Sequence, residues 1–198
     1  MRGAERASWK SFAERAQRSG LTCLAIDPRG QPGRADTLPD PGGSSPRVRV
    51  SLDQRLLDVD AAVHVLREKG ANRDNIALVG AGMGADLVLH YAADRPDIPA
   101  IVLISPGLDR HGMSAEKTIV GMGTRPVLLM VASGDAYAAS SARALKKAAP
   151  GFCELREYNG AAHGTDLLER SLQANEQILL WLSQIIGPAA DTVVAPSP

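Results

Sequence analysis

Hydrophobic residues along the chain form short continuous runs, which alternate with stretches where they recur every three or four residues. Continuous runs are typical of strands buried on both faces, and the recurring pattern is typical of amphipathic helices. The runs predict strands at 21–27, 76–80, 100–105, 126–133 and 153–158. The recurring pattern predicts helices at 6–19, 52–69, 83–94 and 137–149, and a last one from after "NGAAHGTD" to about 186. This alternation predicts an α/β fold: a three-layer sandwich with a mostly parallel sheet of about five strands and helices on both faces.

Glycine and proline mark the segments between these elements. Residues 28–47 are rich in Gly, Pro and Ser and predict a loop, and 106–125 predict a connection with one short helix. The tail "GPAADTVVAPSP", residues 187–198, is predicted to be disordered. We therefore expect one domain over 1–186, since a chain of 198 residues is long enough for a single sizeable core.

Composition argues against several classes of function. The formal net charge is zero and the sequence pI is about 6.9, so we expect no basic surface for nucleic acid. No apolar run approaches the roughly 20 residues of a membrane-spanning helix, so no membrane partner is expected. Cys23 and Cys153 lie in apolar runs without the spacing of metal ligands. We expect buried free thiols, with no metal and no cofactor.

The stretch "IALVGAGMGADLVLHYAADRP", residues 76–96, has two interpretations. Gly80, Gly82 and Ala85 match the G-x-G-x-x-G/A fingerprint of dinucleotide-binding folds. That fingerprint expects an acidic residue at the end of the next strand, which here ends in "ISP", so NAD or FAD binding is the less favoured interpretation. Alternatively, residues 80–84 match the nucleophile elbow G-x-S-x-G, with Gly82 at the position of the serine.

The elbow interpretation predicts an acid and then a histidine, each placed after a later strand. Asp135 follows the run "VLLMVASG", and His163 follows "LREYNGAA" and precedes the last helix. A histidine can take a proton from a nucleophile, while a carboxylate fixes the tautomer of the imidazole and stabilises its charged form. Ligand sites of such sheets lie at the carboxyl ends of the strands, where Gly82, Asp135 and His163 are all expected.

Together with "CLAIDPRGQPGR", "IVLISPGLD" and "NGAAHGTDLL", these stretches resemble the α/β-hydrolase family over most of residues 9–186. The resemblance is closest to bacterial dienelactone-hydrolase-like and esterase-like members. It implies that Asp135 is the acid and His163 the base of a catalytic triad. It places Gly82 where the family has its serine, and it makes the backbone N–H of Met83 an oxyanion donor. The ligand that it implies is a small acyl or ester compound.

Gly82 departs from the family pattern, because glycine has no side chain with which to form an acyl-enzyme. Glycine is also the residue least penalised in the strained elbow conformation, so the turn should persist without the covalent chemistry. We therefore expect a protein of the carboxylic-ester or acyl hydrolase type that is catalytically impaired. Other routes to catalysis are Ser105 or Ser133 as the nucleophile, or a water activated by the His163–Asp135 pair. The alternative is a non-catalytic module that binds a small ligand or a protein.

The amino terminus is a second departure, because the family has three further strands before its first helix. Arg2–Arg6 resemble the remnant of the loop that supplies a second oxyanion donor, so Arg2 is a candidate contact for substrate. His111 is another, since it lies in a Gly-flanked loop near the expected mouth of the site.

The absence of those strands affects the sheet and the localisation. Residues 21–27 would pair directly with 76–80, pair with another chain, or leave a gap with unpaired backbone groups. An exposed sheet edge would favour a homodimer. The sequence as it stands has no signal peptide and predicts a cytoplasmic protein, unless an upstream segment is missing.

Overall fold

The computed structural model describes residues 6–30, 50–110 and 113–187. Its main sheet has four parallel strands in the order β1-β2-β5-β6, and β3 and β4 form a short antiparallel pair. The elements are η1 Arg6–Trp9, α1 Lys10–Arg18, α2 Leu52–Glu68, η2 Arg73–Asn75, β1 Ala77–Ala81, α3 Met83–Ala93, β2 Ala100–Ile104, β3 Asp109–Arg110, β4 Met113–Ser114, α4 Ala115–Ile119, η3 Val120–Met122, β5 Val127–Ala132, α5 Ala136–Ala148, β6 Cys153–Tyr158, α6 Asp166–Arg170 and α7 Leu172–Ile186.

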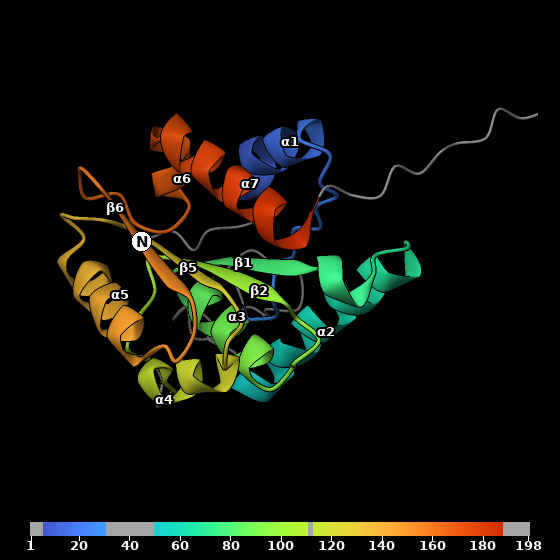
Figure 1. The fold of residues 1–198 in the computed structure, drawn as a ribbon, viewed down its shortest axis with the longest axis horizontal. Helices are drawn as coiled ribbons and strands as arrows, with labels where there is room; N and C mark the ends of the chain where they lie inside the picture. The colour runs from blue at the N-terminus through green and yellow to red at the C-terminus, as the bar shows by residue number, and fades with distance from the viewer. Residues whose placement is uncertain (1–5, 31–49, 111–112, 188–198) are drawn as a thin grey trace, which may run out of the picture.

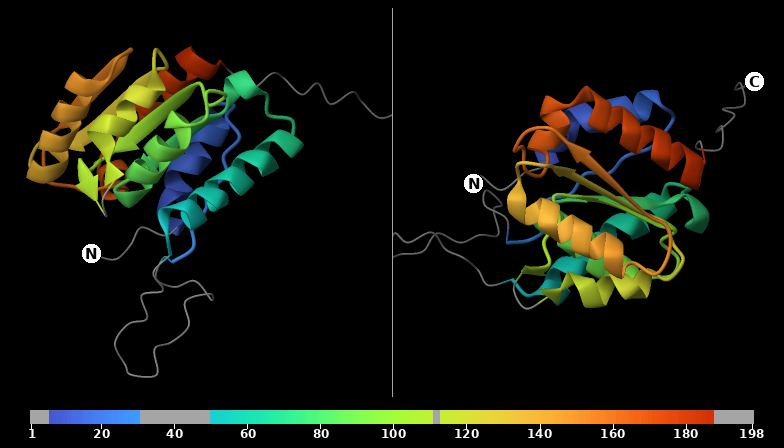
Figure 2. Two further views of the ribbon diagram at one scale, coloured as in Figure 1. Left: turned by 90° about the horizontal axis from the view of Figure 1, so that it is seen from below. Right: turned by 60° about the vertical axis from the view of Figure 1, so that its left-hand side comes forward.

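Helices cover both faces of the main sheet, which gives the molecule three layers (Figures 1 and 2). One face packs against α1, α6 and α7, where Val102 of β2 shares a buried cluster with Phe12. The other face packs against α2, α3, α4 and α5, where Leu103 shares a second cluster with Val63. Successive residues of a strand point to opposite faces, so β2 and β5 are apolar at every position. The predicted α/β sandwich is confirmed.

Polar side chains define the ends of two helices. Ser51 Oγ accepts a hydrogen bond from Gln54 N–H at 3.2 Å, and Gln54 Oε1 accepts one from Ser51 N–H at 3.0 Å. This reciprocal capping box starts α2. Ser171 Oγ accepts from Ala174 N–H at 3.1 Å and starts α7, so the predicted last helix is divided into α6 and α7. The helix predicted at 6–19 is divided into η1 and α1. The helices predicted at 52–69, 83–94 and 137–149, and four of the predicted strands, lie within one residue of the observed bounds.

The predicted strand at 21–27 is wrong, and the main sheet has four strands rather than about five. Leu21 packs in the cluster under α1 and α7, whereas Ile26 packs against the cluster on the opposite face. Residues 21–27 therefore pass from one layer to the other, on the β1 side of the sheet and away from β6 (Figures 1 and 2). An apolar run becomes a strand only when its backbone finds a partner, and among the described residues β1 pairs with β2 alone.

Both cysteines also differ from expectation. Cys23 lies in this unpaired segment and is exposed rather than buried, and Cys153 is half-buried at the start of β6. Neither forms a disulfide. Among the described residues, no group of three or more His, Cys, Asp or Glu side chains is arranged to hold a metal ion.

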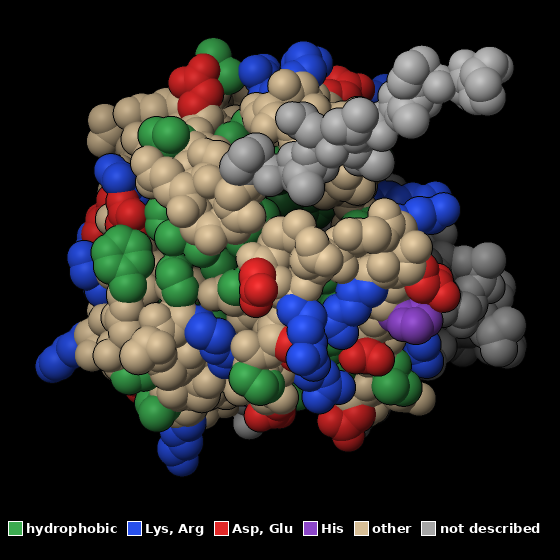
Figure 3. All heavy atoms as spheres, turned by 45° about the vertical axis from the view of Figure 1, so that its right-hand side comes forward, with side chains coloured by type: hydrophobic (Ala, Val, Ile, Leu, Met, Phe, Trp, Pro, Cys, Tyr) green, Lys and Arg blue, Asp and Glu red, His purple; other side chains and the backbone are tan. Residues whose placement is uncertain are grey.

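The surface carries charges of both signs. Figure 3 shows basic and acidic side chains interspersed on one face. Several of them form ion pairs between elements, such as Arg67 with Asp97 and Arg29 with Asp58, the latter at 2.7 Å. No helix in the described part of the chain is both long and apolar enough to cross a membrane.

Candidate active site

The turn between β1 and α3 has the geometry of a sharp elbow. Gly82 stands at its centre with φ 55° and ψ −119°, a conformation that strains any residue with a side chain. Its N–H donates to the carbonyl of Ile104 at 2.8 Å, which continues the β1–β2 ladder by one residue. A Cβ on Gly80 would lie 2.2 Å from the carbonyl oxygen of Gly84, so only glycine lets the helix return this closely over the strand.

Met83 is the first residue of α3, next to Gly82. The first N–H groups of a helix have no acceptor within the helix and carry the positive end of its dipole. The Met83 N–H therefore has the character that an oxyanion donor needs, as the resemblance implied. The Met83 side chain accepts a hydrogen bond from Arg55 of α2 at 2.9 Å.

Asp135 lies three residues beyond the end of β5 and has two contacts. One oxygen, Oδ1, accepts from Ala138 N–H at 3.5 Å, and the residue forms the N-cap of α5. The other, Oδ2, lies 2.5 Å from Nδ1 of His163. Because the helix start holds one oxygen, the second is fixed toward the imidazole. The Asp135 side chain is 15% exposed and that of His163 is 30% exposed, so the pair is shielded but reachable.

The loop that carries His163 crosses the carboxyl ends of three strands. It leaves β6 at Tyr158, and the carbonyl of Gly160 accepts from Gly134 N–H, after β5, at 2.7 Å. Gly164 N–H then donates to Ser105 Oγ, after β2, at 2.9 Å. These two hydrogen bonds carry the loop from one edge of the sheet to the elbow at the other.

The crossing brings His163 to Gly82. A Cβ built on Gly82 would lie 3.3 Å from Nε2 of His163, which is the nearest atom among the described residues other than the two chain neighbours of Gly82. A hydroxyl one bond beyond that Cβ would be within hydrogen-bond reach of Nε2 after a shift of a few tenths of an ångström. Gly82, Asp135 and His163 thus lie together as the sequence predicted, with an aligned imidazole–carboxylate pair facing a position that has no side chain.

Ser105 has a place that the sequence did not reveal. It is fully buried and is the one described non-glycine residue with a positive φ, 50°. Its N–H donates to Met130 at 2.8 Å, and its hydroxyl accepts from the residue after His163. Since Ser105 is buried, it cannot meet a substrate as an alternative nucleophile, and its hydroxyl instead holds the loop. Ser133 is exposed beyond β5, and its N–H donates to the carbonyl of Tyr158 at 2.8 Å.

The remaining candidate contacts, Arg2 and His111, lie outside the described residues. Asp86, in the first turn of α3, is buried and accepts from Gly107 N–H at 3.1 Å, so it holds the turn that follows Ser105. Two adjoining cavities of about 650 and 300 Å³ lie beside the His163 loop, between the end of β6 and the start of α7. Tyr158, Asn159 and Gln173 line both of them.

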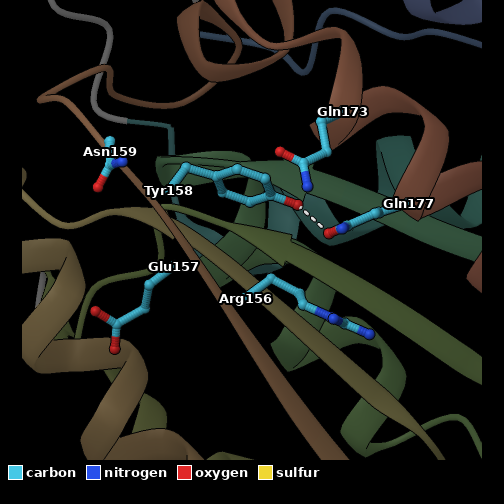
Figure 4. A pocket seen from close by; sticks show the side chains of 6 residues that line it. All are labelled: Arg156, Glu157, Tyr158, Asn159, Gln173 and Gln177. Atoms are coloured by element: carbon cyan, nitrogen blue, oxygen red, sulfur yellow. Dashed lines mark hydrogen bonds between the residues drawn. The ribbon is translucent and has the colours of Figure 1, made fainter.

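Figure 4 shows the smaller cavity, where the phenol of Tyr158 donates to Gln177 at 2.6 Å. Arg156 and the amides of Gln173 and Gln177 lie on the same side of β6 as the phenol, and Glu157 points to the other side. Burial raises the pKa of Tyr158 to about 12. The lining of the smaller cavity is polar, and that of the larger one also includes Ala161, Ala162 and Leu167. Neither lining includes Gly82, so these cavities are separate from the elbow.

The geometry of elbow, acid and histidine agrees with the comparison with known families. The model of the serine aminopeptidase family S33, a family of α/β-hydrolases, matches residues 3–122, which include the elbow. The chain belongs to this family. The matched residues include Gly82 at the centre of the elbow. A comparison with curated protein sequences gives no match.

Solved structures of similar fold cover nearly the whole chain. A monoacylglycerol lipase from Paleococcus ferrophilus has a TM-score of 0.66 and 19% identity, with 92% of this chain and 91% of that chain covered. A metagenome-derived lipolytic enzyme has a TM-score of 0.74 and 15% identity, with 93% and 90% covered. A dienelactone hydrolase from Anabaena variabilis has a TM-score of 0.65 and 20% identity, with 92% and 80% covered. At these identities the likeness establishes the fold.

Proposed function

We propose that this chain is an S33 α/β-hydrolase of the carboxylic-ester or acyl hydrolase type whose site binds small acyl compounds but is impaired in turnover. The main observation behind the proposal is a distance. A Cβ built on Gly82 would lie 3.3 Å from Nε2 of His163. His163 and Asp135 are aligned to activate a nucleophile at position 82. The backbone there has the elbow conformation, but Gly82 has no side chain to act as that nucleophile. The structural neighbours named as lipolytic enzymes and dienelactone hydrolase support the class of ligand.

The chemistry available to the natural chain follows from this arrangement. A serine at position 82 would attack an acyl carbonyl while His163 took its proton, and the Met83 N–H would donate to the oxyanion. With glycine there, no acyl-enzyme can form. His163 can assist only a water molecule, and general-base assistance alone contributes typically about 10²–10⁴-fold.

The test is hydrolysis of p-nitrophenyl butyrate by the natural chain, Gly82→Ser and Gly82→Ala. Both variants place a side chain at φ 55°, which costs about 1–3 kcal/mol in either case, so Gly82→Ala is the matched control for strain. We expect Gly82→Ser to exceed both other proteins in kcat/KM by at least about 100-fold, since loss of a triad serine costs orders of magnitude. Adding His163→Ala should abolish the gain.

Two results would contradict the proposal. If Gly82→Ser has the same circular dichroism spectrum as Gly82→Ala and hydrolyses no faster, the aligned pair does not activate a hydroxyl at this position. If the natural chain already hydrolyses the ester at the rate of Gly82→Ser, and His163→Ala stops it, glycine does not impair the site.

The second candidate function is a non-catalytic binding module. The specific observation in its favour is the outer edge of β1, which pairs with no described strand and ends next to Gly82.

A further inference from the structure

The two adjoining cavities on the β6 side of the molecule have the size of a small-molecule site. Their volumes of about 300 and 650 Å³ lie in the range of such sites, roughly 300–1,000 Å³. They are surrounded by the end of β6, the start of the His163 loop, α6 and the first half of α7. Tyr158, Asn159 and Gln173 line both cavities, so one ligand that spans the two can contact all three residues.

Three side-chain carboxamides line the cavities, those of Asn159, Gln173 and Gln177 (Figure 4). Each has an acceptor oxygen and an NH₂ group with two donors. The oxygen of Gln177 accepts a hydrogen bond from the phenol of Tyr158 at 2.6 Å. Within the described residues, the NH₂ group of Gln177 and the amides of Asn159 and Gln173 have no hydrogen-bond partner. A ligand in the cavities therefore meets donors and acceptors side by side.

The charges around the cavities are balanced. On β6, Glu157 is ion-paired and points to the other side of the strand in Figure 4, and Arg156 pairs with Glu154. On α6, Asp166 and Arg170 line the larger cavity with one charge of each sign. An anion would be attracted by Arg170 but repelled by the carboxylate of Asp166. The lining therefore favours a ligand without net charge.

The cavities also have apolar surface. The ring of Tyr158 lines both of them, and Ala161, Ala162 and Leu167 line the larger one. Burial raises the pKa of the Tyr158 phenol to about 12, so the phenol stays protonated near neutral pH and keeps its hydrogen bond to Gln177. Apolar groups next to carboxamides suit a ligand that has C–H surface on its faces and hydroxyl groups around its rim.

We propose that these cavities bind a neutral, polyhydroxylated ligand of the sugar class. A hydroxyl both donates and accepts, so it can pair with either end of a carboxamide, whereas a carboxylate only accepts and an ammonium only donates. The C–H groups of a sugar ring can pack against the aromatic ring of Tyr158. This binding goes beyond the acyl chemistry at Gly82 and does not depend on it.

The experiment follows the amide signals of the full chain by nuclear magnetic resonance. The probes are the disaccharides maltose and cellobiose. The comparison compounds are cyclohexanol, which has a similar ring with a single hydroxyl, and inorganic phosphate, which is an anion. We expect at least one of the two sugars to shift the side-chain signals of Asn159, Gln173 and Gln177 in a saturable way. Neither comparison compound should shift them at the same concentration.

A matched pair of variants removes an amide from the cavities or from elsewhere on α7. Gln173→Ala changes the lining, and Gln184→Ala changes a residue that lines neither cavity. Both positions are exposed, so both variants should fold. Gln173→Ala should weaken sugar binding by about 5-fold or more, which is the effect of one lost hydrogen bond, and Gln184→Ala should leave it unchanged.

Three results would overturn this proposal. The first is that neither sugar shifts the three side-chain amide signals. The second is equal sugar binding by Gln173→Ala and Gln184→Ala, which would place the ligand elsewhere on the molecule. The third is that cyclohexanol or phosphate binds at these residues as tightly as the sugars, which would show an apolar site or an anion site instead.

Discussion

β1 and β6 are the two edge strands of the main sheet, and both lead into the candidate active site. β1 ends at Gly82, whereas β6 is followed by the loop that carries His163. β6 contains charged residues. One of them, Glu157, accepts a hydrogen bond from Arg143 of α5, and this guanidinium lowers the pKa of the Glu157 carboxyl. β1 has no charge and depends on close backbone packing. The comparison shows that the strand leading to His163 is rich in charge, whereas the strand leading to Gly82 is uncharged and closely packed at its end.

The largest expected effect tests the backbone packing at the β1 end. A Cβ on Gly80 would meet Gly84 O at 2.2 Å and Ala85 N at 2.7 Å, whereas a Cβ on Gly84 would meet nothing within 4 Å. We expect Gly80→Ala to lower the free energy of unfolding by about 3 kcal/mol or more, because backbone atoms must move. Gly84→Ala, inside α3, should raise it by about 0.5–1 kcal/mol. Urea unfolding followed by circular dichroism measures both, and equal effects would show that the elbow is not closely packed.

Alkaline pH should lower the free energy of unfolding through the thiol of Cys153, at the start of β6. Burial raises the pKa of the Cys153 thiol from 9.0 to about 11. A raised pKa in the folded state means that the stabilisation is complete below pH 9 and is lost as the pH rises through about 11. A shift of this size corresponds to at most about 3 kcal/mol. The free energy of unfolding should therefore fall between pH 9 and 11.

Two variants separate Cys153 from the other thiol. Burial also raises the pKa of the Cys23 thiol, but the large shift is that of Cys153, so the alkaline fall should be smaller in Cys153→Ala than in Cys23→Ala. Urea unfolding at pH 8 and pH 10.5 gives the comparison. Identical falls in both variants would mean that burial of Cys153 does not control the alkaline stability.

The smallest expected effect is that of replacing Ser105, whose hydroxyl connects the end of β2 to the His163 loop that follows β6. Ser105→Ala removes the acceptor of Gly164 N–H, and an unpaired buried donor costs about 1–3 kcal/mol. We also expect the ¹H and ¹⁵N signals of the His163 imidazole to change, because the loop loses its tie next to that ring. Ser140→Ala, at an exposed position of α5, is the control and should leave those signals unchanged. Signals that do not move in Ser105→Ala would show that other contacts position His163.

The fold could be predicted from hydrophobic patterning wherever the pattern and the pairing agree. β2 and β5 are apolar at every residue because helices cover both their faces, and this is visible in one chain. Residues 21–27 have the same pattern but no partner in the described sheet, and composition does not specify a partner. The exposed Cys23 follows from that missing pairing.

The candidate site was predictable to a similar degree. Gly82, Asp135 and His163 follow strands in an order that reflects their chemistry, so sequence alone could group them. The role of Ser105 could not be predicted, because its positive φ and its contact with Gly164 depend on residues far away in the chain. A serine after a strand is otherwise typical of an ordinary turn.

The contacts of the His163 loop affect how the molecule unfolds. Gly160 is hydrogen-bonded to Gly134 after β5, and Gly164 is hydrogen-bonded to Ser105 after β2. The loop that follows β6 is therefore attached to the carboxyl ends of two other strands. Local unfolding of β6 would displace the loop backbone that aligns the His163 imidazole with Asp135. The dyad should therefore not melt as an independent local unit. Its nuclear magnetic resonance signals should disappear with those of the sheet in a single cooperative transition, and the site becomes a reporter of the whole fold.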